Sequence, residues 1–270
     1  MSNDYASPLA TRPIVVKYGG NAMGGGDPLL GSLGDLIHEG IPVVLVHGGG
    51  PEIDRWLSER AIPTHRIDGL RATDAATLEI SEAVLCGTIN KRLVRECTAL
   101  GMRAIGISGE DARLLVARPV GNRALGFVGE IASTDPAPLL HLLAAGYTPV
   151  VAPLAVSDDG ASALNVNADL AAAAIAAALH ARAFVMVTNV PRVMRDVNDA
   201  SSAIDRMTLD EARAFAASPA CAGGMKPKIA AAIAAAQHGA TASYICGPQS
   251  IAAALAGSAT IICHPNRSEV

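Results

Sequence analysis

Two glycine-rich segments follow the first two apolar runs of the chain, and both have the composition of anion-binding loops. They read KYGGN over residues 17–21 and HGGGP over residues 47–51. Glycine lets backbone N–H groups approach an anion with no side chain in the way, and a helix that starts at the second loop adds partial positive charge there. The pair favours a phosphoryl-binding site over two ligand-free turns, with the candidate binding residues Gly19, Gly20, Gly48 and Gly49.

Lysine is rare in this chain, and its placement favours the same interpretation. Of the 21 basic residues, the lysines are Lys17, Lys91, Lys226 and Lys228. Lys17 precedes the first glycine loop, and GGMKPK over residues 223–228 places two lysines in the first turn of an expected helix. Cations oppose the helix dipole at that end, so a bound polyanion would relieve an unfavourable arrangement. The alternative is that both lysines extend into water.

Three polar side chains near expected strand ends could complete such a site. Arg71 lies just before Thr73 and Asp74, either of which can cap the helix that follows. Its planar guanidinium suits a carboxylate held by two parallel hydrogen bonds, although a solvated or cap-paired arginine fits the sequence equally well. Asn165 and Asp169 belong to the segment NVNAD, which opens an alanine-rich helix. Asp169 either complements the helix dipole, or orients the lysines, or holds the metal ion of a nucleotide, and Asn165 could bind an amide or a carboxylate.

Composition and absent motifs argue against several classes of protein. The 270 residues carry a formal net charge of −4, which disfavours a nucleic-acid partner. Five cysteines without a CxxC pair disfavour a disulfide framework or a zinc site and favour a reducing cytoplasm. The longest apolar run, residues 170–179, is about half the ~20 residues that a membrane span needs. The GxxxxGK[ST] spacing of P-loop enzymes is absent, as is GxGxxG after either early strand.

Apolar runs alternate with helical segments along the whole chain, which is typical of an α/β protein with a mostly parallel sheet covered on both faces. We expect strands at 13–18, 42–47, 102–107, 147–152, 184–188, 242–246 and 260–263, and paired β segments at 114–117 and 126–132. We expect helices at 27–39, 52–60, 74–97, 138–145, 168–180, 209–217, 225–238 and 250–255.

Two further expectations follow from this pattern, one for a helix and one for the site. The helix over residues 74–97 has Leu85, Ile89, Leu93 and Cys97 four apart on one stripe. Ligands of such sheets bind beyond the carboxyl ends of the strands, which makes the loops at 19–27, 48–51, 106–112, 152–168 and 188–208 the candidate site.

In this order, the segments resemble the amino-acid kinase family. The resemblance runs from about residue 14 to residue 262 and includes KYGGNAM, HGGGPEI, GLRATDAATLEI, GTINKRLV, AIGISGEDA, LGFVGEI, PVVAPLAV, NVNAD and GGMKPK. It implies a three-layer αβα sandwich around a mostly parallel central sheet. It also implies an N-terminal lobe, residues 1–181, that binds the amino-acid substrate and a C-terminal lobe, residues 182–270, that binds ATP.

The resemblance implies roles for individual residues. Lys17 and Lys228 would neutralise charge on the transferring phosphoryl group, and Asp169 would hold both lysines. The substrate-binding residues would be Gly49, Gly50, Arg71 and Asn165, and the nucleotide-binding residues Thr188, Asn189, Gly223, Gly224, Met225 and Lys226. Mg²⁺ would arrive with ATP, with no metal site of the protein's own.

The implied reaction is ATP-dependent phosphorylation of the side-chain carboxylate of N-acetyl-L-glutamate, a step of arginine biosynthesis. A carboxylate is already ionised at neutral pH, so no general base is needed, and we interpret His47 as structural. One departure is NVPRV over residues 189–193, where members of the family commonly have DVPGV. Loss of the acid could weaken a ribose contact, and loss of the glycine matters if Arg192 must adopt a positive φ.

These departures leave alternatives open. One is a kinase for aminoadipate or glutamate linked to an acidic carrier protein, which would need a basic surface around the substrate mouth; the candidates for that surface are Arg66, Arg71, Arg118 and Arg123. The other is a non-catalytic amino-acid or nucleotide sensor. Arginine-inhibited members of the family have an additional helix before the first strand, whereas residues 1–12 here are short and contain Pro8. We therefore expect a cytoplasmic homodimer with little inhibition by arginine.

Overall fold

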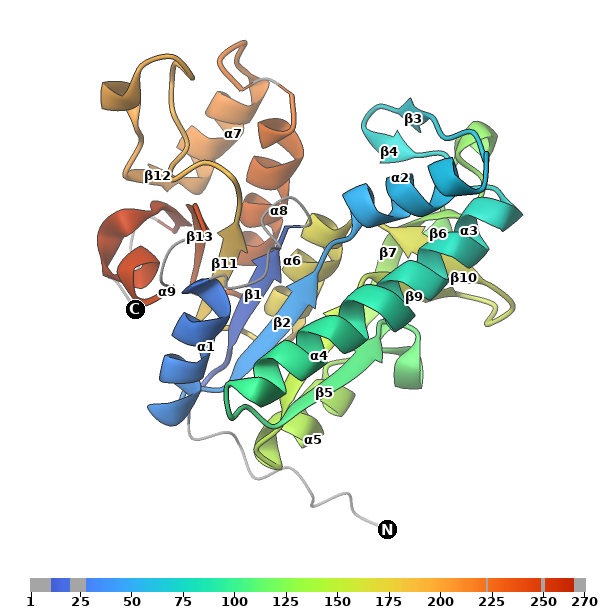
Figure 1. Ribbon diagram of the computed structural model, residues 1–270. Helices are drawn as coiled ribbons and strands as arrows, with labels where there is room; N and C mark the ends of the chain where they lie inside the picture. Colours follow the sequence, from blue (N-terminus) through green and yellow to red (C-terminus); the bar gives the residue numbers. More distant parts are fainter. Residues whose placement is uncertain (1–10, 20–27, 222, 249–250, 265–270) are drawn as a thin grey trace.

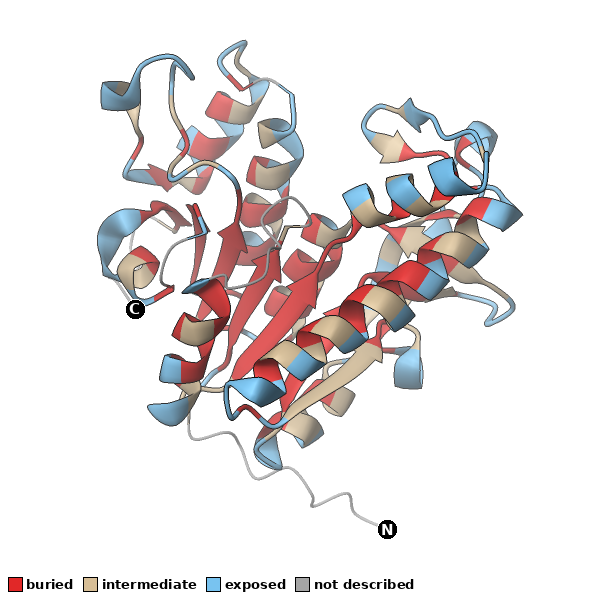
Figure 2. Ribbon diagram, viewed as in Figure 1, coloured by how far each residue is buried: buried red, intermediate tan, exposed pale blue. Residues whose placement is uncertain are grey.

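Apolar, β-branched runs form a central sheet in the computed structural model, which describes residues 11–19, 28–221, 223–248 and 251–264. Such continuous runs are expected where a sheet is covered on both faces, and Figure 2 shows the middle strands of the sheet as the most buried part of the molecule. Every residue is buried in the strands β1 (Ile14–Tyr18), β2 (Val43–His47), β8 (Thr148–Ala152), β11 (Ala183–Val187) and β13 (Ala242–Cys246).

The sheet has eight strands in the order β12-β14-β13-β11-β1-β2-β8-β5. The remaining members are β5 (Ala104–Ser108), β12 (Arg206–Thr208) and β14 (Thr260–Cys263). The strands from β13 to β5 pair in parallel, whereas β14 is antiparallel to β13 and parallel to β12. The carboxyl ends of β1, β2 and β11 therefore meet at one edge, near the middle of the sheet (Figure 1).

Helices form a layer on each face, and each layer encloses a separate apolar core. One face is covered by α1 (Pro28–His38), α2 (Gly50–Glu59), α3 (Ala75–Glu82), α4 (Asn90–Ala99) and α9 (Ile251–Ala253). The other is covered by α5 (Ala137–Ala144), α6 (Ala168–Ala178), α7 (Leu209–Ala217) and α8 (Met225–His238). The predicted three-layer αβα fold is confirmed. Within the described ranges, no helix has the length and apolar composition needed to cross a membrane.

Two smaller β units flank one end of the sheet. The strands β6 (Leu115–Pro119), β7 (Val128–Thr134), β9 (Leu154–Ser157) and β10 (Ala163–Val166) close into a small barrel. The predicted pairing of β6 with β7 is confirmed, but residues 152–168 are not a simple loop, because β9 and β10 lie there. The second unit is the hairpin of β3 (Arg66–Ile67) and β4 (Leu70–Arg71). Its turn residues Asp68 and Gly69 both have positive φ, as an Asp-Gly turn of this kind requires.

The long helix predicted over residues 74–97 is not a single α-helix. A π-helical segment, Ala83–Ile89, joins α3 to α4. The predicted apolar stripe of Leu85, Ile89, Leu93 and Cys97 is buried throughout. A strict spacing of four drifts around an α-helix with about 3.6 residues per turn, and the wider π turn offsets that drift. The π-helical segment therefore keeps the apolar stripe on one face of the helix.

Candidate active site

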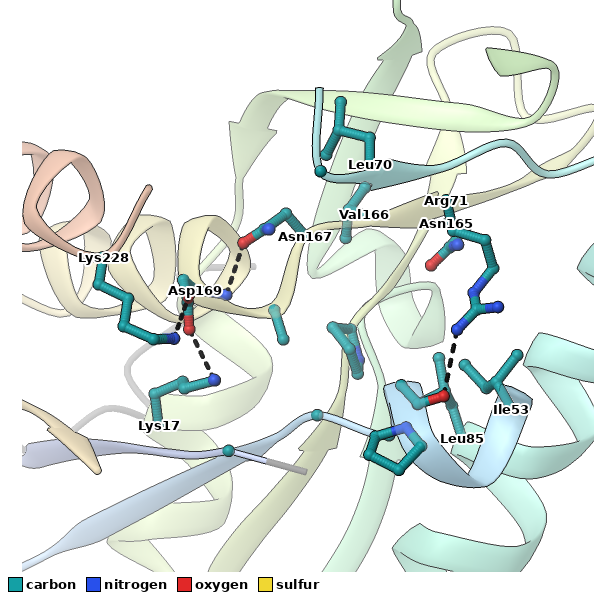
Figure 3. Close-up of a pocket in the computed structure, with 18 of the residues that line it drawn as sticks. Lys17, Ile53, Leu70, Arg71, Leu85, Asn165, Val166, Asn167, Asp169 and Lys228 are labelled. Atoms are coloured by element: carbon teal, nitrogen blue, oxygen red, sulfur yellow. Dashed lines mark hydrogen bonds and ion pairs between the residues drawn. The ribbon is translucent and has the colours of Figure 1, made fainter. Parts of the chain in front are cut away.

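A cavity of about 520 Å³ opens at the carboxyl ends of the central strands. Its walls come from the ends of β1, β2 and β11, the starts of α2 and α6, the hairpin β3–β4 and the barrel strands β7 and β10. This is the edge at which parallel α/β sheets bind their ligands. Figure 3 shows that its charged side chains gather in two groups, one containing Lys17 and the other Arg71.

The first group consists of Lys17, Asp169 and Lys228, which come from three different elements. Lys17 projects from β1, and its Nζ lies 2.6 Å from Asp169 Oδ1. Lys228 Nζ, from α8, lies 3.0 Å from Asp169 Oδ2. Asp169 stands in the first turn of α6, where the N-cap side chain of Asn167 accepts hydrogen bonds from the N–H groups of Asp169 and Leu170. One carboxylate thus holds two ammonium groups side by side.

Burial and charge act in opposite directions on these groups. Burial alone would raise the pKa of Asp169, but the charges of Lys17 and Lys228 together outweigh it and hold the pKa below its usual value. Burial lowers the pKa of Lys17; its ion pair with Asp169 opposes this effect, and the charge of Lys228 adds to it. With two cations for one anion, the cluster has a net positive charge when fully ionised. It is therefore suited to receive a further anion, which would also favour the charged form of Lys17.

The second glycine loop presents unpaired backbone donors to the cavity. Gly49 is the N-cap of α2 and Gly50 its first residue, and both line the cavity. Within the described part of the chain, neither N–H group has a hydrogen-bond acceptor. A Cβ on Gly49 would lie 2.6 Å from side-chain atoms of both Leu85 and Ile89, so a larger residue would force these buried side chains to move. Two free N–H groups at a helix start are suited to bind an anion.

The remaining predicted phosphate-binding residues lie as follows. Gly19 lines the cavity, and a Cβ there would meet the carbonyl oxygen of Val187 at 3.2 Å. Gly48 also lines the cavity, and its N–H donates to the carbonyl of Tyr18 at 2.9 Å, which ties the loop to β1. Gly20 is outside the described residues.

The second group surrounds Arg71, whose side chain is 5% exposed. Its guanidinium pairs with the carboxylate of Asp54 and donates to Thr64 Oγ1 at 2.9 Å and to the carbonyl of Gly50 at 3.1 Å. Asp54 pairs with Arg66 as well, at 3.2 Å. Asp54 is not among the residues predicted from the sequence, because nothing in its local pattern separates it from an ordinary exposed residue of a helix.

Asn165 lies on the same side of the cavity, on β10. Its Nδ2 donates to Thr73 Oγ1 at 3.1 Å, and Thr73 Oγ1 donates to the carbonyl of Arg71 at 2.8 Å. Asp74, rather than Thr73, caps α3, by accepting a hydrogen bond from the N–H of Thr77. The side chain of Thr73 is thereby free to connect Asn165 to the strand that carries Arg71.

The predicted nucleotide-binding residues are only partly brought together. Thr188 and Asn189 line the cavity at the end of β11. Thr188 Oγ1 accepts from the N–H of Val190 at 3.1 Å and donates to its carbonyl at 3.0 Å, which fixes a tight turn. From α8, Lys228 lines the cavity. The turn before it does not line the cavity. The predicted residues in that turn are Gly223, Gly224, Met225 and Lys226.

Arg192, which stands where members of the family commonly have glycine, does not have a positive φ. The backbone strain that its substitution for glycine could have caused is therefore absent. Its guanidinium pairs with Asp205 and donates to the carbonyl of Gly257 at 2.6 Å. The side chain thus connects the loop after β11 to two later segments, a role that the local sequence does not indicate.

Comparison with known proteins gives a consistent result. The sequence matches the model of the amino acid kinase family over residues 12–247. It is 42% identical over 244 residues to the acetylglutamate kinase of Synechococcus sp. (strain CC9605), covering 89% of this chain and 83% of that protein. A solved protein from Streptococcus mutans UA159 superposes with a TM-score of 0.80 at 25% identity, over 93% of this chain and 98% of that one. Carbamate kinase from Giardia lamblia, bound to AMP-PNP, has the same fold: TM-score 0.72, 16% identity, 95% and 100% of the two chains.

Proposed function

This chain belongs to the amino acid kinase family, and on that premise we propose that it transfers the γ-phosphoryl group of ATP to the side-chain carboxylate of N-acetyl-L-glutamate. The product is an acyl phosphate, and the step belongs to arginine biosynthesis. The observation that carries the proposal is the cavity with Lys17, Asp169 and Lys228 on one side and Arg71 and Asn165 on the other. One side suits a phosphoryl group, and the other suits the carboxylate and amide of an acylated amino acid.

The residues of the cavity suit a reaction that needs charge stabilisation rather than a base. The attacking carboxylate is ionised at neutral pH, and phosphoryl transfer depends mainly on positioning and on neutralising the charge of the transition state. Lys17 and Lys228 supply that charge, and Asp169 keeps the two ammonium groups adjacent. The N–H groups of Gly49 and Gly50 supply hydrogen bonds to the phosphoryl oxygens.

Magnesium is proposed to arrive with ATP. The acidic residues of the described cavity lining are Asp54 and Asp169, and each is already paired with two cations. Magnesium is commonly held by substrate phosphates with few protein ligands, so the phosphate oxygens of ATP would hold it here. Among the residues that the structure describes, no group of three or more His, Cys, Asp or Glu side chains is placed to hold a metal ion.

Residues 1–181 are proposed to bind the amino acid, and residues 182–270 to bind ATP. The strands β1, β2, β8 and β5 come from the first part, and β11, β13, β14 and β12 from the second, so the division falls between two adjacent strands of the sheet. Arg71 and Asn165 lie in the first part, and Thr188 and Asn189 in the second. A variant of Arg71 tests this division, because it should affect one substrate alone.

Arg71→Lys should raise KM for N-acetylglutamate by about 10–100-fold, because a single ammonium cannot reproduce a bidentate guanidinium contact. KM for ATP should stay unchanged. Steady-state kinetics with each substrate varied in turn measures both constants. Arg66→Lys is the matched control, because Arg66 pairs with the same Asp54 but its side chain is 48% exposed. An equal rise of both KM values would contradict the assignment of Arg71 to the amino acid.

The surface charges favour a free amino-acid acceptor over a carrier-linked one. Of the four arginines considered for a basic mouth, Arg71 is buried, Arg66 pairs with Asp54, and Arg118 pairs with Asp158 at 3.0 Å. Asp54 and Asp158 together offset two of the four arginine charges, and the buried Arg71 adds none to the surface, so the basic mouth that an acidic carrier would need is weakened. A non-catalytic sensor is disfavoured because the complete lysine–aspartate cluster has no evident purpose without phosphoryl transfer.

Trapping of the acyl phosphate with hydroxylamine tests the proposal. The assay compares N-acetylglutamate, N-acetylaminoadipate, free glutamate and aspartate as acceptors in the presence of ATP and Mg²⁺. Turnover with N-acetylglutamate alone would support the proposal. Failure of all four acceptors, with ATP still bound, would favour a carrier-linked substrate, and failure of ATP binding would favour the sensor.

Assembly and location are further proposals. We propose a homodimer that works in a reducing cytoplasm; all five cysteines are free thiols, which suits such a compartment. Light scattering on the purified protein should give the mass of two chains, and a hexamer would contradict the proposal. Cell fractionation with an antibody to the chain tests the location.

A further inference from the structure

His47 is a buried polar residue directly beneath the second glycine loop, and the mechanism above does not use it. It is the last residue of β2 and is 0% exposed. Its ring faces α4 and contacts the side chain of Asn90, the first residue of that helix. Lys17, in contrast, faces α6 and α8 on the other side of the sheet. Buried polar groups are nearly always hydrogen-bonded, so the partners of this imidazole indicate what it does.

The partners of His47 assign its tautomer. Nδ1 lies 2.9 Å from the carbonyl oxygen of Gly48, and because a carbonyl can only accept, Nδ1 carries the proton. Nε2 lies 3.3 Å from Asn90 Nδ2. Asn90 Nδ2 also donates to the carbonyl of Val150 at 2.9 Å and lies 3.3 Å from that of Ile107, which fixes it as the amide nitrogen. One of its two hydrogens points to Val150, and the other is shared between Ile107 and His47 Nε2, which accepts. A protonated Nδ1 and an accepting Nε2 together define one neutral tautomer of the ring.

The charge state of the ring agrees with this assignment. Burial lowers the pKa of His47 to about 4; the hydrogen bond to Gly48 opposes this, and the nearby charge of Arg92 adds to it. The ring is therefore neutral over the range in which a cytoplasmic enzyme works. Asn90 is in turn oriented by Lys91, whose Nζ donates to Asn90 Oδ1 at 3.1 Å.

The contact with the Gly48 carbonyl also determines the direction of the next N–H group. The peptide bond between Gly48 and Gly49 is planar and trans, so the N–H of Gly49 points away from the Gly48 oxygen. That oxygen is held on the α4 side of the sheet by His47. The N–H of Gly49 is consequently directed to the opposite side, where Lys17 and Asp169 lie, and it has no acceptor among the described residues.

We propose that His47, held by Asn90, is a positioning residue that fixes the Gly48–Gly49 peptide so that the N–H of Gly49 faces the transferring phosphoryl group. The inference rests on the proposed kinase function and adds to it the residue that orients one of the phosphoryl-binding donors. His47 itself never contacts the substrate, so its contribution should appear in the transition state rather than in the binding of either substrate.

Three substitutions separate the two contacts of the ring. His47→Asn places an amide nitrogen near the position of Nδ1 and can keep the bond to Gly48. His47→Gln places its amide nearer the position of Nε2, and His47→Leu removes both contacts. Loss of an oxyanion-type donor lowers kcat by roughly 10²–10³-fold, and misdirection of one should cost about 10–100-fold. We expect kcat to fall by about 10–100-fold in His47→Gln and His47→Leu. In His47→Asn, kcat should stay within about threefold of the unmodified enzyme. Both KM values should change little in all three variants.

A binding measurement distinguishes positioning from stability. ADP, Mg²⁺, N-acetylglutamate and AlF₄⁻ together imitate the transferring phosphoryl group, and the affinity for AlF₄⁻ should fall in parallel with kcat while the affinity for ADP alone stays constant. Equal kcat in the Asn and Gln variants would overturn the proposal, as would unchanged AlF₄⁻ affinity in a variant with reduced kcat. If the Leu variant does not fold, the ratio of the Asn and Gln variants still decides. Absence of turnover in the unmodified protein would instead refute the proposed function.

Discussion

Replacement of Lys17 by alanine should lower kcat by about 10²–10³-fold, the loss typical of removing one group that stabilises transition-state charge. Lys17 lines the cavity, and its ammonium lies 2.6 Å from Asp169, on the same side as Lys228. No other described cation of the lining stands on that side, because Arg66 and Arg71 pair with Asp54. KM for N-acetylglutamate should change little, since we propose that Arg71 and Asn165, rather than Lys17, bind that substrate.

The loss in the Lys17 variant must be separated from a loss of folded protein. Lys17→Met retains most of the aliphatic packing of the side chain, so it should stay folded and lose as much activity as Lys17→Ala. Lys17→Arg keeps the charge but not its compact position, and should recover only part of the rate. The hydroxylamine assay measures the rate, and thermal melting measures the folded fraction. Near-normal activity in Lys17→Ala would remove the residue from the mechanism.

Replacement of Asp169 by asparagine should damage both activity and stability. The carboxylate is 6% exposed and pairs with two lysines, and removing one partner of a buried ion pair costs roughly 3–5 kcal/mol. Without the carboxylate, burial and the charge of Lys228 remain to lower the pKa of Lys17, so Lys17 should lose much of its positive charge. We expect kcat to fall by about 10²–10³-fold and the denaturant midpoint to fall clearly.

The surface offers a matched control for this variant. Asp158 forms an ion pair with Arg118, but both side chains are about half exposed or more. Such exposed pairs contribute about 0–1 kcal/mol, so Asp158→Asn should leave the denaturant midpoint and kcat nearly unchanged. Similar small effects in both variants would show that Asp169 does not organise the lysines.

Asp169 should also be visible in the pH dependence of stability. Its pKa is lowered in the folded protein, whereas in the unfolded chain it has its ordinary value of about 3.9. The unfolded state therefore binds the proton more readily, so the stabilisation is present above the unfolded pKa and is lost as pH falls through the folded pKa. Denaturant titrations from neutral to acidic pH should show a shallower decline for Asp169→Asn than for the unmodified protein.

The sequence predicted those parts of the structure that repeat a strong local pattern. The runs PIVVKY and PVVLVH became β1 and β2, fully buried, because only strands covered on both faces use such continuous apolar sequence. The glycine loops after them line the cavity, as the rule for parallel sheets requires. Of the lysines beside Gly-Gly pairs, Lys17 and Lys228 line the cavity and Lys226 does not. The unfavourable position of a cation at a helix start therefore indicated the right region for Lys228 but not for its neighbour.

Features that depend on distant partners were not predictable. The strands β9 and β10 have four residues each and are stabilised by closing a barrel with β6 and β7, which no local pattern reveals. The pairing of Asp54 with Arg71 joins residues 17 positions apart through the β3–β4 hairpin. Likewise, nothing in HGGGP indicates that the imidazole of His47 orients a peptide, because that role depends on Asn90, 43 positions away.

The pairing of Arg71 with Asp54 has a consequence for how this protein recognises its substrate. Arg71 and Arg66 share the single carboxylate of Asp54, so the three groups together carry one uncompensated positive charge, and an incoming carboxylate meets a guanidinium that already contacts an anion. It must share the guanidinium or take over the place of Asp54, whose other partner, Arg66, can keep that aspartate neutralised at the surface. Recognition at this end of the cavity then redistributes two arginines between two carboxylates, so that each guanidinium faces one anion. A neutral analogue would leave the uncompensated charge in place.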